Sequence, residues 1–374
     1  MVEAKRIRVG VIGASPDRGW AARAHVPALL ALPAYDITAV GTSRPESARA
    51  AAREFGAAHA FTDARRLAEH PDVDLVVVTV KVPAHAELVG AALAAGKHVY
   101  CEWPLARTTR EAEALARSAR DAGAHHVIGL QARYAPAIAY ARDLLADGRI
   151  GRVTSATVYA ARGKGAGERI PAWAAYTLDR DNGAGTLEVA GGHTLDAVRY
   201  VLGDIADLSA TLSIQSPVHT ITETGETVAV TSPDHLLLHA TLTSGAVVSA
   251  HIHDAKATDA RTRLEISGTR GDLAITSAGP AGPAGLQIGE LRLHGPDAAG
   301  GAYQELPVPD RYRWAQGVDP AAEGFNVAQM YARLARDLHT GSRDLPDFDT
   351  GLALHRLLDT IRLSAATGTR QTPG

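Results

Sequence analysis

The sequence has one cysteine, no long apolar run and no large excess of either charge. Because Cys101 stands alone, the chain cannot form an internal disulfide. No window approaches the roughly 18 unbroken apolar residues of a membrane-spanning helix, so we expect no membrane partner. The 38 Lys and Arg residues against 41 Asp and Glu residues leave a formal charge of -3. This balance offers no positive field for nucleic-acid phosphates, so we expect no nucleic-acid partner.

The start of the chain and its length bear on compartment and domain number. A strand-like run follows the first residues directly, without a secretory signal pattern, so we expect a cytoplasmic protein. A chain of 374 residues exceeds what one hydrophobic core usually serves, and we therefore expect two domains.

Residues 1–130 alternate short apolar runs with helical stretches. Strands are expected at residues 6–12, 35–42, 60–62, 74–80, 98–101 and 127–129. This order is typical of a parallel sheet with helices on both faces. We therefore predict an N-terminal Rossmann dinucleotide-binding domain over residues 1–130 in a chain of the α/β plus α+β class.

Residues 131–345 show a different pattern, in which Thr, Val and Ser alternate. Seven alternating runs between residues 153 and 277 predict a large, mostly antiparallel open sheet with one solvated face. The Gly-, Pro- and Ala-rich stretch 277–301 is expected to be an exposed loop. We assign residues 131–345 to a C-terminal α/β domain for substrate binding and oligomerisation, and residues 346–374 to a helix returning towards the first domain. The cleft between the domains is the expected ligand site.

A glycine-rich turn follows the first predicted strand. Gly10 and Gly13 end that strand, and Gly19 precedes a helix that starts near Trp20. Glycines let the backbone turn sharply and approach a pyrophosphate, which free amides at the helix start then bind. The loop is longer than in the standard G-x-G-x-x-G pattern, and the alternative is a purely structural turn. Its place in a βαβ unit favours dinucleotide binding.

The end of the second predicted strand bears on which dinucleotide binds. It carries no Asp or Glu to hold the ribose hydroxyls of NAD, whereas Ser43 and Arg44 suit a 2′-phosphate. We therefore predict a preference for NADP(H) over NAD(H). The alternative is that Arg44 is an ordinary solvated loop arginine.

Five stretches of the chain form a recognisable pattern: residues 9–29 (VGVIGASPDRGWAARAHVPAL), 72–105, 183–203 (GAGTLEVAGGHTLDAVRYVLG), 265–273 (EISGTRGDL) and the final helix. In these stretches the chain resembles the Gfo/Idh/MocA family of glucose-fructose oxidoreductase and inositol dehydrogenase-like enzymes. The resemblance implies NAD(P)-dependent hydride transfer at a sugar or cyclitol carbon. It also implies a homo-oligomer, a dimer or tetramer, formed through the C-terminal sheet.

Two departures from the family pattern fall on catalytic positions. Trp103 stands where the family's Glu-Lys-Pro motif has its lysine, and Val189 stands on the aspartate of its G-G-G-x-x-x-D-x-G-x-H motif. These departures and the long GASPDRGW turn are similar to the branch that includes the yeast galactose-regulon repressor. That relative binds a dinucleotide but regulates transcription through protein contacts.

His193 and Lys81 are the candidate catalytic residues. His193 matches the family's histidine, and an imidazole titrates near neutral pH; its alternative role is to satisfy a buried carbonyl. Lys81 follows the fourth predicted strand and would replace the missing lysine; its alternative is a cofactor phosphate or a neighbouring acid as partner.

Pattern and resemblance together define three further expectations. The predicted cofactor-binding residues are Gly10, Gly13, Ala14, Ser15, Arg18, Gly19, Trp20, Ser43, Arg44, Val80, His85, Glu102, Trp103 and Gln131. The predicted substrate-binding residues are Trp103, Tyr134, Lys164, Trp173, Tyr176 and His193. No metal is assigned, because His251 and His253 on one face of a strand lack a third ligand at suitable spacing.

The sequence predicts an NAD(P)-dependent oxidoreductase that transfers a hydride to or from a carbohydrate-like or other polyhydroxylated small molecule, with His193 in the proton relay. Two alternatives remain open. One is a non-catalytic dinucleotide-binding regulator that acts through protein contacts. The other is a lyase or glycosidase that uses a tightly bound nicotinamide transiently.

Overall fold

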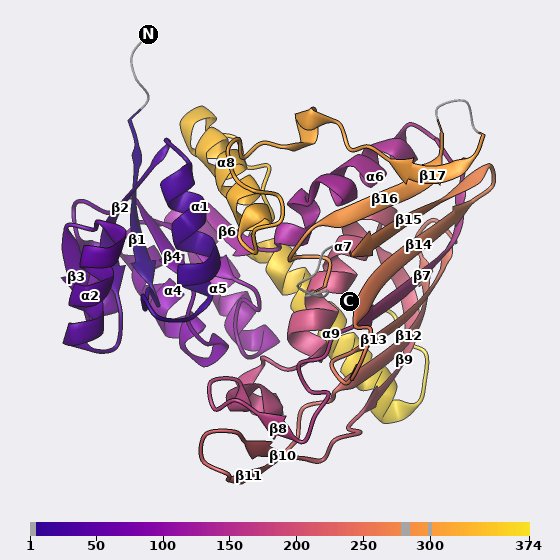
Figure 1. Ribbon diagram of the computed structural model, residues 1–374, viewed down its shortest axis with the longest axis horizontal. Helices are drawn as coiled ribbons and strands as arrows, with labels where there is room; N and C mark the ends of the chain where they lie inside the picture. Colours follow the sequence, from indigo (N-terminus) through magenta and orange to yellow (C-terminus); the bar gives the residue numbers. More distant parts are fainter. Residues whose placement is uncertain (1–4, 278–284, 298–300) are drawn as a thin grey trace. The chain divides into compact units, whose positions relative to one another are not determined.

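The computed structural model describes residues 5–277, 285–297 and 301–374. The chain forms two compact units (Figure 1). The first contains residues 1–131 and 314–353, and the second contains residues 132–313 and 354–374. This division differs from the predicted boundaries, because residues 314–345 pack with the first unit. None of the helices in the described ranges combines the length and apolar character needed to cross a membrane.

The first unit is built on a six-stranded parallel sheet. In chain order its strands are β1 (Ile7–Ile12), β2 (Tyr35–Gly41), β3 (His59–Phe61), β4 (Leu75–Val78), β5 (His98–Glu102) and β6 (His126–Gly129). The spatial order is β3-β2-β1-β4-β5-β6, which confirms the predicted Rossmann topology. All four residues of β4 are buried, as expected of a parallel strand covered on both faces.

Helices connect the strands of the first unit. They are the π-helical turn η1 (Ala21–His25), α1 (Val26–Ala31), α2 (Pro45–Phe55), α3 (Ala64–Glu69), η2 (Val82–Ala84), α4 (His85–Ala94), α5 (Thr109–Ala122) and, from the later segment, α8 (Phe325–Thr340). Local chemistry sets several boundaries. The Thr108 hydroxyl caps α5 by accepting from the Glu111 amide, and Gly123 ends the helix in a left-handed conformation. Helix α8 packs on α1.

The second unit contains an eight-stranded sheet. Its strands are β7 (Val153–Ala161), β9 (Ile205–Ser213), β12 (His235–Leu242), β13 (Val247–His253), β14 (Arg261–Gly268), β15 (Gly271–Ser277), β16 (Leu291–Pro296) and β17 (Tyr303–Leu306). The order is β17-β16-β15-β14-β7-β13-β12-β9, and only the β7 and β13 pair is parallel among these strands. The predicted mostly antiparallel sheet is therefore confirmed. Residues alternate between buried and exposed along β12, so one face packs on the core and the other meets solvent.

Two of these strands lie where the sequence predicted a loop or no element. Strand β16 falls inside the stretch 277–301 that was expected to be a loop, and residues 278–284 and 298–300 of that stretch lie outside the described residues. Strand β17 follows it. The Gly, Pro and Ala content of the stretch is typical of a loop. Strand β16 forms there through its antiparallel pairing with β15, which local composition does not indicate.

The remaining elements of the second unit include a three-stranded sheet of β8 (Arg169–Ile170), β10 (Val218–Ile221) and β11 (Thr227–Ala229). Its helices and turns are α6 (Pro136–Ala146), η4 (Ala175–Leu178), η5 (Arg180–Asn182), the π-helical turn η6 (Leu187–Gly191), α7 (Gly192–Leu202) and η7 (Asp310–Tyr312). The short turn η3 (Gln131–Tyr134) and the final helix α9 (Phe348–Thr367) contain the boundaries between the units.

Candidate functional site

A groove of about 330 Å³ opens on the first unit where β1, β2 and β4 end. It is lined by Ile12, Gly13, Ser15, Arg18, Gly41, Thr42, Ser43, Arg44, Ser47, Thr62, Ala64, Val80 and Leu88. Six of the predicted cofactor residues meet there: Gly13, Ser15, Arg18, Ser43, Arg44 and Val80. The carboxyl ends of parallel strands are where open sheets of this class bind ligands.

Gly13 makes the close approach that the groove requires. Its φ of +95° lies in a region that favours glycine. A Cβ atom at this position would lie 2.9 Å from both the Thr79 Oγ1 and the Val80 Cγ1 atoms. The Ser15 amide donates to the Gly13 carbonyl at 3.0 Å, so the turn is tight directly after β1. This cradle suits the approach of a phosphate to the backbone.

The polar lining of the groove is basic and hydroxylic. Arg18 and Arg44 supply two guanidinium groups, and none of the described lining residues is acidic. The Thr42 hydroxyl donates to the Arg44 carbonyl at 2.9 Å, and the Ser47 hydroxyl donates to the same carbonyl at 3.0 Å. These bonds shape the β2–α2 turn that presents Ser43 and Arg44. The donor set fits the phosphates of a dinucleotide.

Four predicted cofactor residues of the glycine turn do not line this groove. Gly10 lies inside β1, where a Cβ would meet the Leu67 side chain at 2.6 Å, so it serves packing. Ala14 is buried, and its amide donates to the Gly41 carbonyl. Gly19 takes a φ of +97° before the π-helical turn η1. The indole Nε1 of Trp20 is buried without a hydrogen-bond partner among the described residues.

His85 does not line the groove, but it contacts the backbone of the lining residue Val80 and of Pro104. Its Nδ1 lies 2.8 Å from the Pro104 carbonyl and its Nε2 lies 3.0 Å from the Val80 carbonyl. Burial lowers the pKa of His85, while the carbonyl contacts oppose that effect. The residue therefore joins the end of the β4 segment to the turn after β5 and has a structural position.

Glu102, at the end of β5, belongs to a buried network that the sequence did not reveal. Its Oε1 lies 3.0 Å from Nε2 of His25, whose Nδ1 lies 2.7 Å from the Tyr331 hydroxyl. Trp103 is buried, with 5% of its surface exposed, so its ring offers less contact surface than expected. Gln131 is buried too, and its Oε1 lacks a hydrogen-bond partner among the described residues.

A small pocket in the second unit contains one of the predicted substrate residues, Lys164. The pocket has a volume of about 40 Å³, enough for roughly one ordered water molecule or one substituent of a ligand. The Lys164 Nζ donates to the Thr177 hydroxyl at 3.1 Å. The lysine side chain is solvent-accessible, but dense surrounding protein desolvates its ammonium, and with the Arg162 charge this lowers its pKa to about 8.

An ion pair between Arg162 and Asp254 forms the polar wall of this pocket. The Arg162 Nη2 donates to Asp254 Oδ2 at 2.7 Å, and the Thr186 hydroxyl donates to the same oxygen at 2.9 Å. His219 Nδ1 and Ser232 Oγ are buried beside the pocket without hydrogen-bond partners among the described residues. These side chains are available to a ligand hydroxyl.

His193 lies at the start of α7 and is 4% exposed. Burial and the Arg162 charge lower its pKa to about 3, so the ring is neutral at physiological pH. This differs from the expected titration near neutral pH. Its Nδ1 has no hydrogen-bond partner among the described residues, which does not support the alternative of a ring bonded to a buried carbonyl at that atom. Arg162 influences both His193 and Lys164 electrostatically.

The other predicted residues are more scattered. Lys81 is exposed and precedes η2, and Trp173 is 59% exposed. Tyr134 is buried, and burial raises the pKa of Tyr176. None of these four lines either pocket described above.

Val189 stands where the family motif has its aspartate, and Glu188 precedes it in the sequence. Val189 lines the Lys164 pocket, so an apolar side chain stands there. The neighbouring Glu188 is bound by Arg362, with Oε1 2.5 Å from Nη2. Glu188 is therefore held in an ion pair with Arg362 of α9.

Comparison with known protein families matches both units. Residues 7–130 match an oxidoreductase family with an NAD-binding Rossmann fold, GFO_IDH_MocA, and residues 136–277 match the C-terminal domain of Gal80p. The chain belongs to the Gfo/Idh/MocA oxidoreductase family, which confirms the resemblance seen in the sequence.

Relatives of this chain include enzymes and a regulator. Dehydrogenase aclE of Aspergillus oryzae is 37% identical over 63% of this chain and 66% of its own length. The 1,5-anhydro-D-fructose reductase of Ensifer adhaerens is 32% identical over 71% of this chain and 74% of its own. The galactose/lactose metabolism regulatory protein GAL80 of Saccharomyces cerevisiae is 27% identical over 97% of this chain and 93% of its own.

A solved structure shares the whole fold. The crystal structure of an oxidoreductase domain protein from Kribbella flavida is 28% identical, covers 99% of this chain and 100% of its own, and superposes with a TM-score of 0.86. The fold thus carries both known enzymes and a known regulator, and the function of this chain has to be argued from its own side chains.

Proposed function

We propose that the protein is an NADP(H)-dependent oxidoreductase that acts on a carbohydrate-like or other polyhydroxylated small molecule. The observation that carries the proposal is the groove of the first unit, where Arg18 and Arg44 face a space without an acidic lining residue. A dinucleotide with a 2′-phosphate carries one more charged group than NAD, and a guanidinium binds such a group with paired hydrogen bonds.

Each part of the groove has an assigned role in this proposal. Gly13 and Ser15 hold the pyrophosphate through the tight turn, with Arg18 as its counter-charge. Ser43 and Arg44 hold the 2′-phosphate at the end of β2. When bound, the nicotinamide supplies or accepts the hydride.

The second unit supplies the residues that bind the substrate and that exchange a proton with its hydroxyl group. His193 is neutral, so it accepts or donates one hydrogen bond at a substrate hydroxyl without a charge cost. Lys164, with a pKa of about 8, is partly deprotonated near neutral pH and takes the hydroxyl proton in the oxidation direction. We favour Lys164 over Lys81 as the replacement for the family's lysine, because Lys164 lines a pocket with Arg162 and Asp254.

The second candidate function is a regulator that binds a dinucleotide and acts through protein contacts. Two observations favour it: the match of residues 136–277 to the C-terminal domain of Gal80p, and the apolar Val189 at the family's aspartate position. Both candidate functions use the nucleotide groove, but the oxidoreductase converts a substrate and the regulator does not.

Self-association is a further part of the proposal. We propose a homo-oligomer formed through the outer face of the eight-stranded sheet, where Leu237 is 40% exposed and Val247 55% exposed. Apolar side chains of this size on an open sheet face suit contact with a second copy.

The test is a fluorescence titration of the full chain with NADPH and with NADH. We expect NADPH to bind at least about tenfold more tightly, and Arg44→Asp to reverse the preference, since one paired charge contact contributes about 1.5–3 kcal/mol. Arg49→Asp is the matched control, because Arg49 lies on helix α2, which Arg44 precedes, but outside the groove. Equal binding of both nucleotides by wild type would refute the NADP(H) preference alone.

Turnover then separates the two candidate functions. A panel of sugars, anhydro sugars and cyclitols is assayed by nicotinamide absorbance, with His193→Gln and Lys164→Met as variants. Turnover that either variant reduces without changing nucleotide affinity supports the enzyme. Tight nucleotide binding with no turnover across the panel supports the regulator, and substrate loss without net absorbance change supports the transient use of a bound nicotinamide. Failure of both nucleotides to bind refutes all three.

A further inference from the structure

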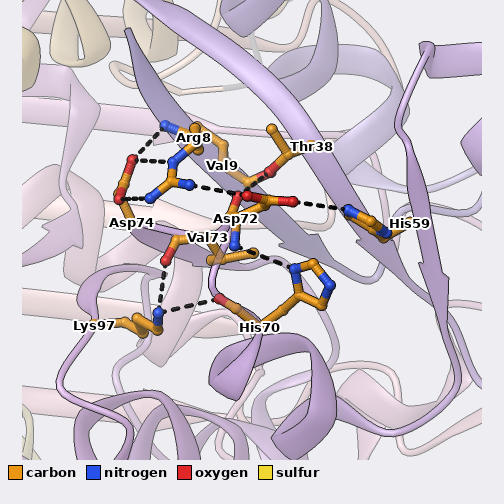
Figure 2. A network of polar contacts seen from close by, with 9 residues as sticks. All are labelled: Arg8, Val9, Thr38, His59, His70, Asp72, Val73, Asp74 and Lys97. Carbon is orange, nitrogen blue, oxygen red and sulfur yellow. Dashed lines mark hydrogen bonds and ion pairs between the residues drawn. The ribbon is translucent and has the colours of Figure 1, made fainter. Parts of the chain in front are cut away.

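Two histidines and an aspartate meet at the edge of the parallel sheet, at the ends of the strands away from the nucleotide groove. His59 begins β3, His70 follows the last turn of α3, and Asp72 lies in the turn that leads to β4 (Figure 2). One donor atom of each residue lies within 4.8 Å of the donor atoms of the other two. These residues take no part in the nucleotide groove or in the Lys164 pocket.

The distances in this cluster are close to those of a metal centre. Nε2 of His59 lies 3.2 Å from Oδ2 of Asp72. Tetrahedral Zn²⁺ with bonds of about 2.0–2.1 Å keeps its ligand atoms about 3.3 Å apart, so this pair already has the spacing of two ligands. The His59 and His70 ring centroids are 4.0 Å apart. The donor atoms all lie within 4.8 Å of one another, so a side-chain rotation of His70 that shortens its distances towards about 3.3 Å completes a three-ligand set.

The backbone around the cluster is held in place by other side chains. The Lys97 Nζ donates to the His70 carbonyl at 3.2 Å and to the Val73 carbonyl at 2.7 Å. The Thr38 hydroxyl donates to the Asp72 carbonyl at 2.6 Å. The turn that carries two of the three ligands is therefore fixed without a ligand, and binding costs little further ordering of the chain.

We propose that His59, His70 and Asp72 form a site for a divalent ion with the ligand preference of Zn²⁺. Imidazole nitrogens and a carboxylate oxygen are the ligand types that Zn²⁺ takes, and water fills the open position. The carboxylate brings a negative charge, and the Asp72 side chain is 49% exposed, so the ion has access from solvent.

Two interactions within the cluster oppose binding of the ion, because the ion would have to displace them. Arg8 Nη1 lies 3.0 Å from Asp72 Oδ1, but the same guanidinium binds Asp74 through Nε at 2.9 Å and Nη2 at 2.7 Å, so it retains a partner. The Asp72 amide donates to Nδ1 of His70 at 3.2 Å. That bond is lost on coordination, because a neutral imidazole that gives one lone pair to a metal keeps its proton on the other nitrogen.

The expected consequence is a clamp on the sheet edge. Among the described residues strand β3 pairs with β2 alone, and the ion would join its first residue to the turn between α3 and β4. The proposal therefore concerns stability, and it stands independently of the proposed oxidoreductase function. Neither binding of the ion nor the expected gain in stability depends on substrate or nucleotide.

The test is calorimetric titration of ZnCl₂ into the full chain, made without a polyhistidine tag and first freed of metal by a chelator. We expect saturable binding of about one ion per chain and a rise in melting temperature with ion concentration. His59→Gln and His70→Gln should each weaken binding at least about tenfold, because a three-ligand site loses a ligand. Melting without metal shows whether each variant is folded.

The matched control is His98→Gln. His98 has a similar setting, since its Nδ1 accepts the His125 amide at 3.1 Å and its ring contacts the His125 ring at 5.2 Å. It belongs to no group of three close donors in the described residues. The control should bind Zn²⁺ as wild type does. No saturable binding, equal affinity in the His59→Gln and His70→Gln double variant, or loss of binding in His98→Gln would each overturn the proposal.

Discussion

Nε2 of His25 lies 3.0 Å from Oε1 of Glu102, and the same ring reaches the Tyr331 hydroxyl with Nδ1 at 2.7 Å. One neutral tautomer satisfies both contacts: Nε2–H donates to the carboxylate, and Nδ1 accepts from the hydroxyl. The His25 ring is fully buried, so both of its nitrogens are shielded from water. His25 thereby ties the end of β5 to helix α8, a segment about 230 residues further along the chain.

Removing the His25 ring should destabilise the first unit. In His25→Leu the buried Tyr331 hydroxyl and the Glu102 carboxylate both lose a partner, and we expect a loss of about 1–3 kcal/mol in the free energy of unfolding. Tyr331→Phe removes one of the two bonds and should cost about 1 kcal/mol. Urea denaturation followed by circular dichroism measures both. A His25→Leu variant as stable as wild type would show that the network does not support the fold.

Gly13 and Gly19 provide a matched pair for testing the glycine turn. Both have positive φ, +95° and +97°. A Cβ would clash at Gly13, whereas a Cβ built on Gly19 would meet no atom of the described residues within 4 Å, its chain neighbours aside. We expect Gly19→Ala to cost about 1 kcal/mol from backbone strain. Gly13→Ala should cost about 1–3 kcal/mol more from overpacking against Thr79 and Val80. Denaturation curves test the difference, and equal losses would mean that the cradle around Gly13 yields easily.

Local patterns predicted much of the fold. The apolar run that forms β4 and the glycine that ends α5 are readable because each depends on residues close in sequence. The packing of α8 on α1 was not predicted, because it depends on a face of α8 that contacts a helix some 300 residues earlier. Pairing at that separation leaves no trace in local periodicity.

The same distinction explains which site residues were predictable. Gly13, Ser43 and Arg44 lie in turns directly after strands, so topology alone brings them to one groove. The ion pair of Arg162 and Asp254 joins residues 92 positions apart on paired segments, and no spacing signals it. His59 and His70 approach only because α3 returns the chain to the edge of β3.

A charge on the outer sheet face should dissociate the proposed oligomer. Val247 on β13 lies opposite Thr241 on β12, on the face that also carries Leu237. Val247→Lys would bury an ammonium in any apolar contact made there, at a cost of several kcal/mol. Sedimentation equilibrium measures the mass. Leu363→Lys is the control, since Leu363 is 50% exposed on α9. An unchanged mass in Val247→Lys would exclude this face as the interface.

Stability should fall in acid, and the buried His193 should contribute to that fall. The pKa of His193 is lowered from 6.5 to about 3 by burial and by Arg162, so the unfolded chain binds a proton between these values and the folded chain does not. Its contribution to stability is therefore fully present above about pH 6.5 and is lost as the pH falls towards 3. One such proton changes the free energy of unfolding by about 1.4 kcal/mol per pH unit.

Comparison of His193→Gln with wild type isolates this proton. Burial also lowers the pKa of His253, to about 4. More than one histidine therefore contributes to the pH dependence of the free energy of unfolding in wild type, and the difference between the two proteins isolates His193. Between pH 6 and pH 4.5 the slope for His193→Gln should be smaller by about 1.4 kcal/mol per pH unit. His239→Gln, at an exposed position of β12, should keep the wild-type slope. Equal slopes in all three proteins would show that His193 takes up its proton in the folded state, and the neutral hydrogen-bonding role given to it in the proposed reaction would then be wrong.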